Sequence, residues 1–229
     1  MKKQKEAVKV TPNKTNLNHS SSDKNSLFFR YTFFSGVALA IFMLLGFFVF
    51  VPAISIITTI LMIIFICGFY ALGKRYDSKL LKVTSILLIL LIFASIFVAS
   101  FSISPMTQKM VVLVGETAIN AGIGITDITT MTSEQQTILG QALMQNPEFL
   151  RIAGIFFGLL LAYLLGIIIL SILLGVGLIK LKDNVDYAHV AGILQVVGGA
   201  TIILFGVGFL VLLVAFVYNL IIMYKESKK

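Results

Sequence analysis

The chain has 229 residues, of which 58% are hydrophobic and only 12% are charged, and its mean hydropathy is +1.00. Soluble domains carry about 25% charged residues, so this composition excludes a water-soluble globule. The net charge of +8 would favour nucleic-acid binding in a soluble protein. Here the basic residues lie in tails and short loops beside long apolar runs, which is typical of a protein that contacts a lipid bilayer and not nucleic acid.

The N-terminal third predicts a polar tail followed by two membrane helices. Residues 1–30 contain seven Lys or Arg and two acidic residues, with no apolar run before Leu27, which predicts a disordered basic tail. Residues 31–72 are almost wholly apolar, and one straight helix of this length would be about 63 Å long, twice the hydrocarbon thickness of a bilayer. Pro52 is the only helix breaker near the middle of this run. We therefore expect helices at about 31–50 and 52–72, joined by a tight turn.

The next segment predicts a third span and one large loop. Residues 83–103 are apolar and Pro105 follows them, so we expect the helix to stop before the proline. Residues 104–150 are mostly acidic in charge. Within them, Thr132 followed by Gln135 predicts the start of a short helix through a capping box. Residues 110–125 could form a strand, a surface helix or a membrane-dipping segment, and the sequence does not decide among these.

Three further spans are expected in the C-terminal part. The fourth lies at about 152–178. Residues 188–224 are again too long for one span, and Gly206-Val207-Gly208 marks a second tight turn. The fifth and sixth helices are therefore expected at about 188–204 and 207–224, followed by a short tail, 225–229.

The distribution of Lys and Arg supports six spans. With this count, both tails and the loops 73–82 and 179–187 lie on one side of the membrane, and they contain every Lys and Arg except Lys109 and Arg151. Cytoplasmic segments carry the excess of basic residues in membrane proteins. The sequence therefore predicts an all-α protein of the cell membrane with both termini in the cytoplasm and residues 104–150 as an extracytoplasmic cap.

Small residues at helical spacing predict where the helices pack, because they allow two backbones to approach closely. The residues expected at helix contacts are Gly36 and Ala40 in the first span, Gly154, Gly158, Ala162 and Gly166 in the fourth, and Gly192, Gln195 and Gly199 in the fifth. The contacts could be made within the chain, in a homo-oligomer or with another membrane protein. Gln195 is the most polar of these residues, and its amide is expected to hydrogen-bond across helices, with Tyr163 or a backbone carbonyl.

The sequence gives no sign of catalytic or cofactor chemistry. None of the six expected spans has an Asp, Glu, Lys, Arg or His in its interior. This argues against proton-coupled carriers, voltage sensors and intramembrane metalloproteases, which need such groups. No phosphate-binding loop or nucleophile elbow is present, and the lone Cys67 and the two histidines lack the spacing of metal ligands. We therefore expect no enzyme activity, no catalytic or metal-binding residue and no cofactor.

Two apolar segments, 45–82 and 188–225, carry a family resemblance. Each contains an apolar hairpin broken by Pro or Gly, and the first ends in a basic loop containing Tyr. The chain thus resembles a family of small prokaryotic membrane proteins known only as a domain of unknown function (DUF996). The resemblance implies a multi-pass topology in a prokaryotic membrane and supplies no catalytic residues.

Two functions follow as hypotheses. The first is a structural or interaction component of a membrane complex, because small-residue faces are present and buried charge is absent. The second is a passive channel or permease for an uncharged small solute. It rests on the similarity between the segment spanning the second and third helices and that spanning the fourth and fifth, since transporters are often built from repeats.

Overall fold

The computed structural model of the chain describes residues 17–48, 52–123, 131–202 and 207–229. All regular structure in these residues is helical, which confirms the predicted all-α class. The helices are α1 (Leu17–Phe48), α2 (Pro52–Arg75), α3 (Lys79–Val98), the π-helical turn η2 (Ala99–Ile103), α4 (Ser104–Asn120), α5 (Ser133–Gln145), α6 (Pro147–Ile179), α7 (Ala188–Thr201) and α8 (Val207–Glu226). The first expected tight turn, just before Pro52, lies outside the described residues. Of the second, expected at Gly206-Val207-Gly208, Gly206 lies outside them too, whereas Val207 and Gly208 already belong to α8.

Within the described residues, five helical segments are long and apolar enough to cross a membrane. They are Ser26–Leu45, Ala53–Arg75, Lys79–Asn120, Pro147–Ile179 and Val207–Glu226. The α7 helix is also apolar but has only 14 residues, about 21 Å of helix, which is shorter than the hydrocarbon core of a bilayer. The chain is therefore a multi-pass helical membrane protein.

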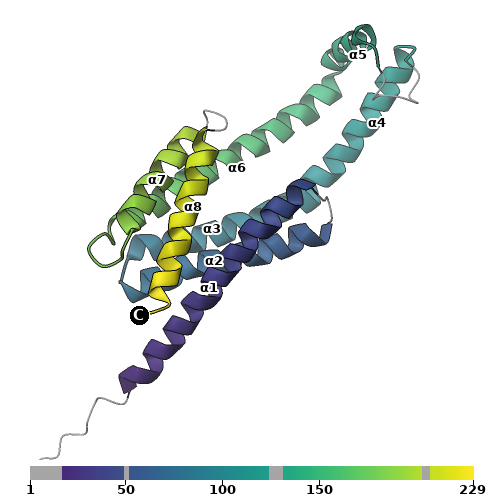
Figure 1. Cartoon of the computed structure of the whole chain (residues 1–229). Coiled ribbons are helices and arrows are strands. Elements are labelled where there is room, and N and C mark those ends of the chain that lie inside the picture. Colours follow the sequence, from purple (N-terminus) through teal and green to yellow (C-terminus); the bar gives the residue numbers. More distant parts are fainter. Residues whose placement is uncertain (1–16, 49–51, 124–130, 203–206) are drawn as a thin grey trace, which may run out of the picture.

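The helices follow one another around a closed ring (Figure 1). Each of α1, α2, α3, α6, α7 and α8 packs against the next in this order, and α8 packs back against α1. One end of the bundle holds the early turns of α1, the 76–78 and 180–187 loops and the C-terminal residues 227–229. We call it the terminal end. The polar contacts between α2, the 180–187 loop and the C-terminal residues all lie there.

The main hydrophobic core lies near the terminal end. Its buried residues are Phe29, Phe65, Phe69, Leu72, Leu81, Leu174, Leu178, Leu181, Val185, Ala188, Ala191, Ile222 and Met223. They come from all six helices of the ring and from the loop between α6 and α7. Farther from this end, large apolar side chains such as Leu44, Ile56, Leu90 and Leu210 are exposed. Such an apolar surface suits contact with lipid chains.

The α1 helix begins earlier than expected. The prediction of a disordered tail over residues 1–30 is wrong for residues 17–30, because α1 starts at Leu17. Extending a helix that already exists is far easier than nucleating one, so the polar residues can continue the apolar helix that follows them. Phe29 also lies in the main core. Residues 1–16 lie outside the described residues.

The third helix does not stop before Pro105, and this prediction is also wrong. The segment Lys79–Asn120 is helical throughout its 42 residues, about 63 Å of helix. A proline inside an α-helix has no N–H to donate, and its ring clashes with the carbonyl four residues earlier. The π-helical turn Ala99–Ile103 comes directly before Pro105, and the Ser104 N–H bonds to the Ala99 carbonyl instead of an α-helical partner. This wider turn makes room for the proline, so the helix continues.

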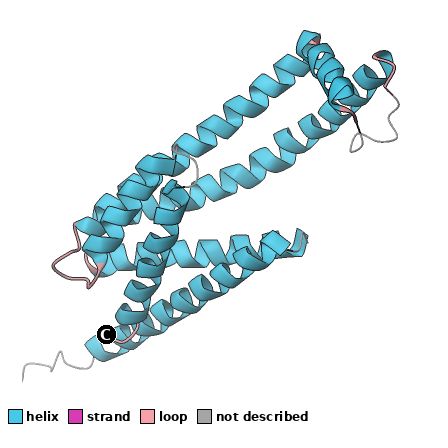
Figure 2. Cartoon of the chain, turned by 45° about the horizontal axis from the view of Figure 1, so that its top comes forward, coloured by secondary structure: helices cyan, strands magenta, loops and turns pink. Residues whose placement is uncertain are grey.

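The described parts of residues 104–150, which are 104–123 and 131–150, are consequently mostly helical and form a projection. The α4 helix lies beside the first part of α6, and α5 crosses their ends (Figures 1 and 2). A small second core holds this tip together, with Ala118, Ile123 and Leu139 buried. The predicted helix start at Thr132 is confirmed, since Thr132 and Gln135 form a complete capping box. We call α4, α5 and residues 147–157 of α6 the projection.

Candidate functional site

Two residues expected at helix contacts lie where α7 meets α6. A Cβ atom added at Gly192 would lie 2.6 Å from the carbonyl oxygen of Gly175, and one added at Gly175 would lie 2.6 Å from the carbonyl oxygen of Gly192. The two backbones therefore touch, and no side chain fits between them. Gly199 lies about two turns after Gly192 in α7, and a Cβ added there would lie 3.0 Å from the Cβ of Ser171 in α6.

The first helix makes its contact through Gly36. A Cβ there would lie 2.8 Å from the Phe65 ring of α2 and closer still to Leu220 of α8. Gly36 therefore sits at the junction of α1, α2 and α8, where the ring of helices closes. Ala40, one turn farther on, is only partly buried.

The four small residues of α6 do not share one environment. Gly166 faces α3, and the Leu91 side chain would lie 3.4 Å from a Cβ added there. A Cβ added at Gly154 or Gly158 would meet no other part of the chain within 4 Å, and Ala162 is exposed. A spacing of four residues advances about 40° around an α-helix at each step. Over three steps the stripe turns by about 120°, so its two ends face different directions. Sequence spacing alone could not show this.

Sequence reasoning missed two close contacts of α6. Gly175 meets α7, as described, and Gly177 meets Leu81 of α3, whose side chain would lie 3.1 Å from an added Cβ. A weaker signal was available, because Ser171 and Gly175 are two more small residues four positions apart in this helix, one position out of step with Gly166. Both glycines are buried, and Leu81 is a residue of the main core.

Gln195 hydrogen-bonds across helices, as expected, but with other partners. Its Nε2 donates to Ser171 Oγ of α6 at 3.5 Å, and its Oε1 accepts from Asn219 Nδ2 of α8 at 3.4 Å. Tyr163 is exposed and is not a partner of Gln195. The buried Asn219 Oδ1 has no hydrogen-bond partner in the part of the chain that the structure describes. We call Ser171, Gln195 and Asn219 the polar chain, and they link α6, α7 and α8.

Glu226 forms a second polar group, which sequence reasoning did not identify. It ends α8, and its side chain is only 1% exposed. Its carboxylate lies 3.2 Å from the Arg75 guanidinium and 2.6 Å from the Lys229 ammonium, and Tyr76 Oη donates to it at 2.8 Å. A buried carboxylate needs such partners. The sequence signal was weak: Glu226 is the one acidic residue in a basic tail.

The electrostatics of the Glu226 group shift two neighbouring pKa values. Burial, together with the hydrogen bond to Glu226, raises the pKa of Tyr76 above its usual value of 10.0. The hydrogen bond to Glu226 also raises the pKa of Lys229 above 10.5. Both shifts favour the protonated side chains, so the group is fully formed at neutral pH.

Further ion pairs tie the short loops of the terminal end together. Lys225 Nζ lies 3.0 Å from Asp186 and 4.5 Å from the ring centre of Tyr187, so the end of α8 is held to the 180–187 loop. The hydrogen bond to Lys225 lowers the pKa of Asp186. Lys82 similarly pairs with Asp77 at 2.9 Å. Several basic residues that indicate membrane orientation therefore also hold the terminal end in shape.

These groups tie helices together and contain no recognisable catalytic arrangement. Among the residues that the structure describes, no three or more His, Cys, Asp or Glu side chains gather where they could hold a metal ion. Fold and contacts together define a multi-pass helical membrane protein whose helices and short loops are joined at the terminal end by ion pairs and hydrogen bonds. Comparison with family models, curated proteins and solved structures finds no match to this chain.

Proposed function

We propose that the chain is a six-span protein of the cell membrane, with both termini cytoplasmic, that serves as a structural or interaction component of a membrane complex. The observation that carries this proposal is an exposed face of α6. Along it, small and large residues alternate at the spacing of a helix-packing seam. The residues are Gly154, Phe157, Gly158, Leu161 and Ala162.

This face is suited to a second helix. Gly154 and Gly158 have open space above them, while the neighbouring Phe157 and Leu161 are 64% and 54% exposed. Large side chains of one helix can fill the gaps above glycines of another. A face that carries both is self-complementary, as a two-fold interface requires. We therefore take a second copy of the chain as the partner.

The ring of helices supports the six-span count. Both α6 and α8 end at the terminal end, and α8 is long enough to cross a membrane. If α6 and α8 both cross the membrane toward this end, the chain returns between Ile179 and Val207, and the packing of α7 against both neighbours supports α7 as the returning span. The concentration of Lys and Arg at the terminal end supports its placement in the cytoplasm. The likeness to the DUF996 family agrees with this topology and remains a proposal.

Oxidative cross-linking in membranes tests the dimer. In a Cys67→Ser background, Gly158→Cys should form a disulfide-linked species of twice the chain mass. Leu160→Cys is the matched control, because Leu160 is 52% exposed but points about 130° away from the centre of the face. Equal cross-linking of the two variants, or none of either, would contradict the proposal. An adduct with a different protein would still support a role in a membrane complex, with that protein and not a second copy of the chain as the partner.

A passive channel or permease for an uncharged small solute is the second candidate. The polar chain favours it, because Asn219 Oδ1 is a buried acceptor with no partner among the described residues. A solute carrying an N–H or O–H group could bond to it. Proteoliposome flux over a panel of uncharged solutes, compared between the parent and Asn219→Leu, tests this. Flux equal to that of empty liposomes would exclude it for those solutes.

A further inference from the structure

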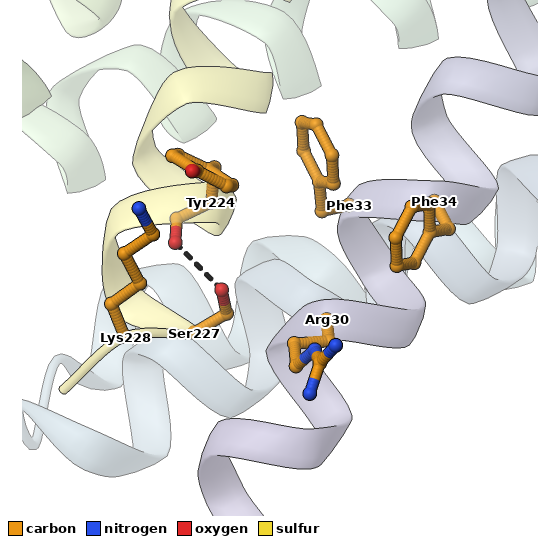
Figure 3. A pocket seen from close by; sticks show the side chains of 6 residues that line it. All are labelled: Arg30, Phe33, Phe34, Tyr224, Ser227 and Lys228. Atoms are coloured by element: carbon orange, nitrogen blue, oxygen red, sulfur yellow. Dashed lines mark hydrogen bonds between the residues drawn. The ribbon is translucent and has the colours of Figure 1, made fainter.

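A pocket of about 320 Å³ opens between α1 and the end of α8 (Figure 3). Its lining residues are Arg30, Phe33 and Phe34 of α1, with Tyr224, Ser227 and Lys228 from α8 and the residues after it. Phe33 and Tyr224 also pack α1 against α8, but the Glu226 group does not include any residue of this pocket. It combines two cations with three aromatic rings, a composition that suits an amphipathic anion.

The pocket carries positive charge that no carboxylate of the described residues balances. Around the terminal end, Arg75, Lys82, Lys225 and Lys229 each pair with a carboxylate. No carboxylate of the described residues lies within ion-pair distance of Arg30 or Lys228. Arg30 and Lys228 line the pocket from two different helical segments, and two such cations without an anionic partner there attract an anion from outside the chain.

The donors of the pocket favour a phosphate. The Ser227 hydroxyl already donates to the Tyr224 carbonyl at 2.6 Å, so it is not available to a ligand (dashed line in Figure 3). The Arg30 guanidinium and the Lys228 ammonium remain. Guanidinium and ammonium groups form strong charge-assisted bonds to phosphate oxygens. The Lys228 Nζ lies 4.2 Å from the ring centre of Tyr224, which holds it over the aromatic wall.

The aromatic wall and the depth of the pocket favour a lipid. Phe33 packs against Tyr224 with ring centres 5.3 Å apart, and Phe34, next to it, is 59% exposed. Arg30 lies one turn inside the apolar segment Ser26–Leu45, and Ser227 follows directly after the segment Val207–Glu226. The pocket is therefore at the boundary of the apolar region, where headgroup phosphates meet the acyl chains.

We propose that this pocket binds an anionic phospholipid, with its phosphate between Arg30 and Lys228 and its acyl chains along Phe33 and Phe34. The shared chemistry is a phosphate anion, which a lipid or free inorganic phosphate could supply. The exposed ring of Phe34 can pack along an apolar chain attached to the phosphate, which inorganic phosphate does not have. This site is independent of the proposed dimer face, which lies on the outer part of α6.

Native mass spectrometry of the full chain in neutral detergent tests the proposal. The probes are phosphatidylglycerol, phosphatidylcholine and inorganic phosphate. The parent should bind phosphatidylglycerol in preference to phosphatidylcholine, and Arg30→Gln/Lys228→Gln should lower this affinity about ten-fold, as expected for the loss of two charge-assisted contacts at exposed positions. The matched control is Lys109→Gln/Arg151→Gln, which removes the same charge from the projection.

The remaining outcomes separate the alternatives. Equal losses in both double variants would mean that net charge alone attracts the lipid, and the site would be overturned. Displacement of the lipid by millimolar inorganic phosphate would overturn the assignment to lipid. If the Arg30/Lys228 variant does not fold, Phe34→Ala serves instead. It should weaken binding of phosphatidylglycerol and leave glycerol phosphate binding unchanged, and equal binding of phosphatidylglycerol to the parent and this variant would overturn the proposal.

Discussion

The carboxylate of Glu226, at the end of α8, lies 3.2 Å from the guanidinium of Arg75, at the end of α2. The same guanidinium donates to the Glu226 carbonyl at 3.1 Å and lies 5.6 Å from the Phe29 ring centre of α1. One arginine thus joins three helices of the ring. The pairing gives Glu226 a structural role that its place in a short basic tail does not suggest.

Glu226→Ala should destabilise the bundle strongly. Removing the carboxylate leaves Arg75 and Lys229 without their partner, and breaking a buried pair in this way costs about 3 kcal/mol. The melting temperature in mild detergent should fall accordingly. Asp77→Asn is the control, since the side chain is 88% exposed, its pair with Lys82 contributes little, and asparagine tolerates the positive φ of residue 77. A similar melting temperature for the parent and Glu226→Ala would contradict the role given to this group.

Stability should be lost at alkaline pH through the same group. The pKa values of Tyr76 and Lys229 are both raised in the folded chain above the usual 10.0 and 10.5. A raised folded-state pKa contributes stability that is fully present below the unfolded value and is lost as the pH rises through the folded one. The melting temperature should therefore be level from pH 7 to about pH 9 and fall above about pH 10. Tyr76→Phe removes one of the two titrations and should make this fall shallower; an identical alkaline profile would contradict the assignment.

The contact between Gly192 and Gly175 should not tolerate a methyl group. A Cβ at Gly192 would lie 2.6 Å from a backbone oxygen, which cannot move aside as a side chain can. Gly192→Ala should therefore push α6 and α7 apart and cost roughly 2 kcal/mol. Gly154→Ala, on the same α6 helix as Gly175 but with open space around it, should be neutral or slightly stabilising in monomeric protein. Equal melting temperatures for the two variants would contradict the close approach.

The sequence predicted the helical class and most helix positions because long apolar runs leave few alternatives in a membrane. It could not predict how far the third helix extends, because Pro105 is a helix breaker by itself and its effect depends on the π-helical turn before it. The start of α1 was missed for a related reason: polar residues 17–30 would not form a helix alone but continue one.

The candidate sites show the same limit. Gln195 could be identified as a polar residue needing a partner, but its partners Ser171 and Asn219 come from other helices, and the register of those helices is set by packing. The Glu226 group and the pocket between α1 and the end of α8 are formed by segments that are far apart in the sequence and meet at the terminal end. Neither has a motif with local spacing, so no single stretch of sequence could reveal it.

The sidedness of the bundle can be tested by thiol labelling in intact cells. In a Cys67→Ser background, Ser133→Cys at the start of α5 should react with a membrane-impermeant reagent. Ser227→Cys at the terminal end should not, because both termini are expected in the cytoplasm. Permeabilised cells provide the control, since Ser227→Cys should label there. Labelling of Ser227→Cys in intact cells would imply an odd number of spans and overturn the six-span proposal.

Removing α5 and most of α4 from the projection should leave the bundle folded. Its small core of Ala118, Ile123 and Leu139 is separate from the main core near the terminal end, and the ion pairs of Glu226 and Lys225 lie at that end too. Replacing residues 110–144 with a short Gly/Ser linker keeps Asn146, whose side chain accepts from the Glu148 and Phe149 N–H groups and caps α6.

The shortened chain should insert and melt within a few degrees of the parent, measured in the same detergent. It should still cross-link through Gly158→Cys, because that face lies on the part of α6 that is retained. Loss of cross-linking with an unchanged melting temperature would show that the projection contributes to recognition of the second copy. A collapse of the melting temperature would instead mean that the projection holds α3 and α6 together, and the two cores would not be independent.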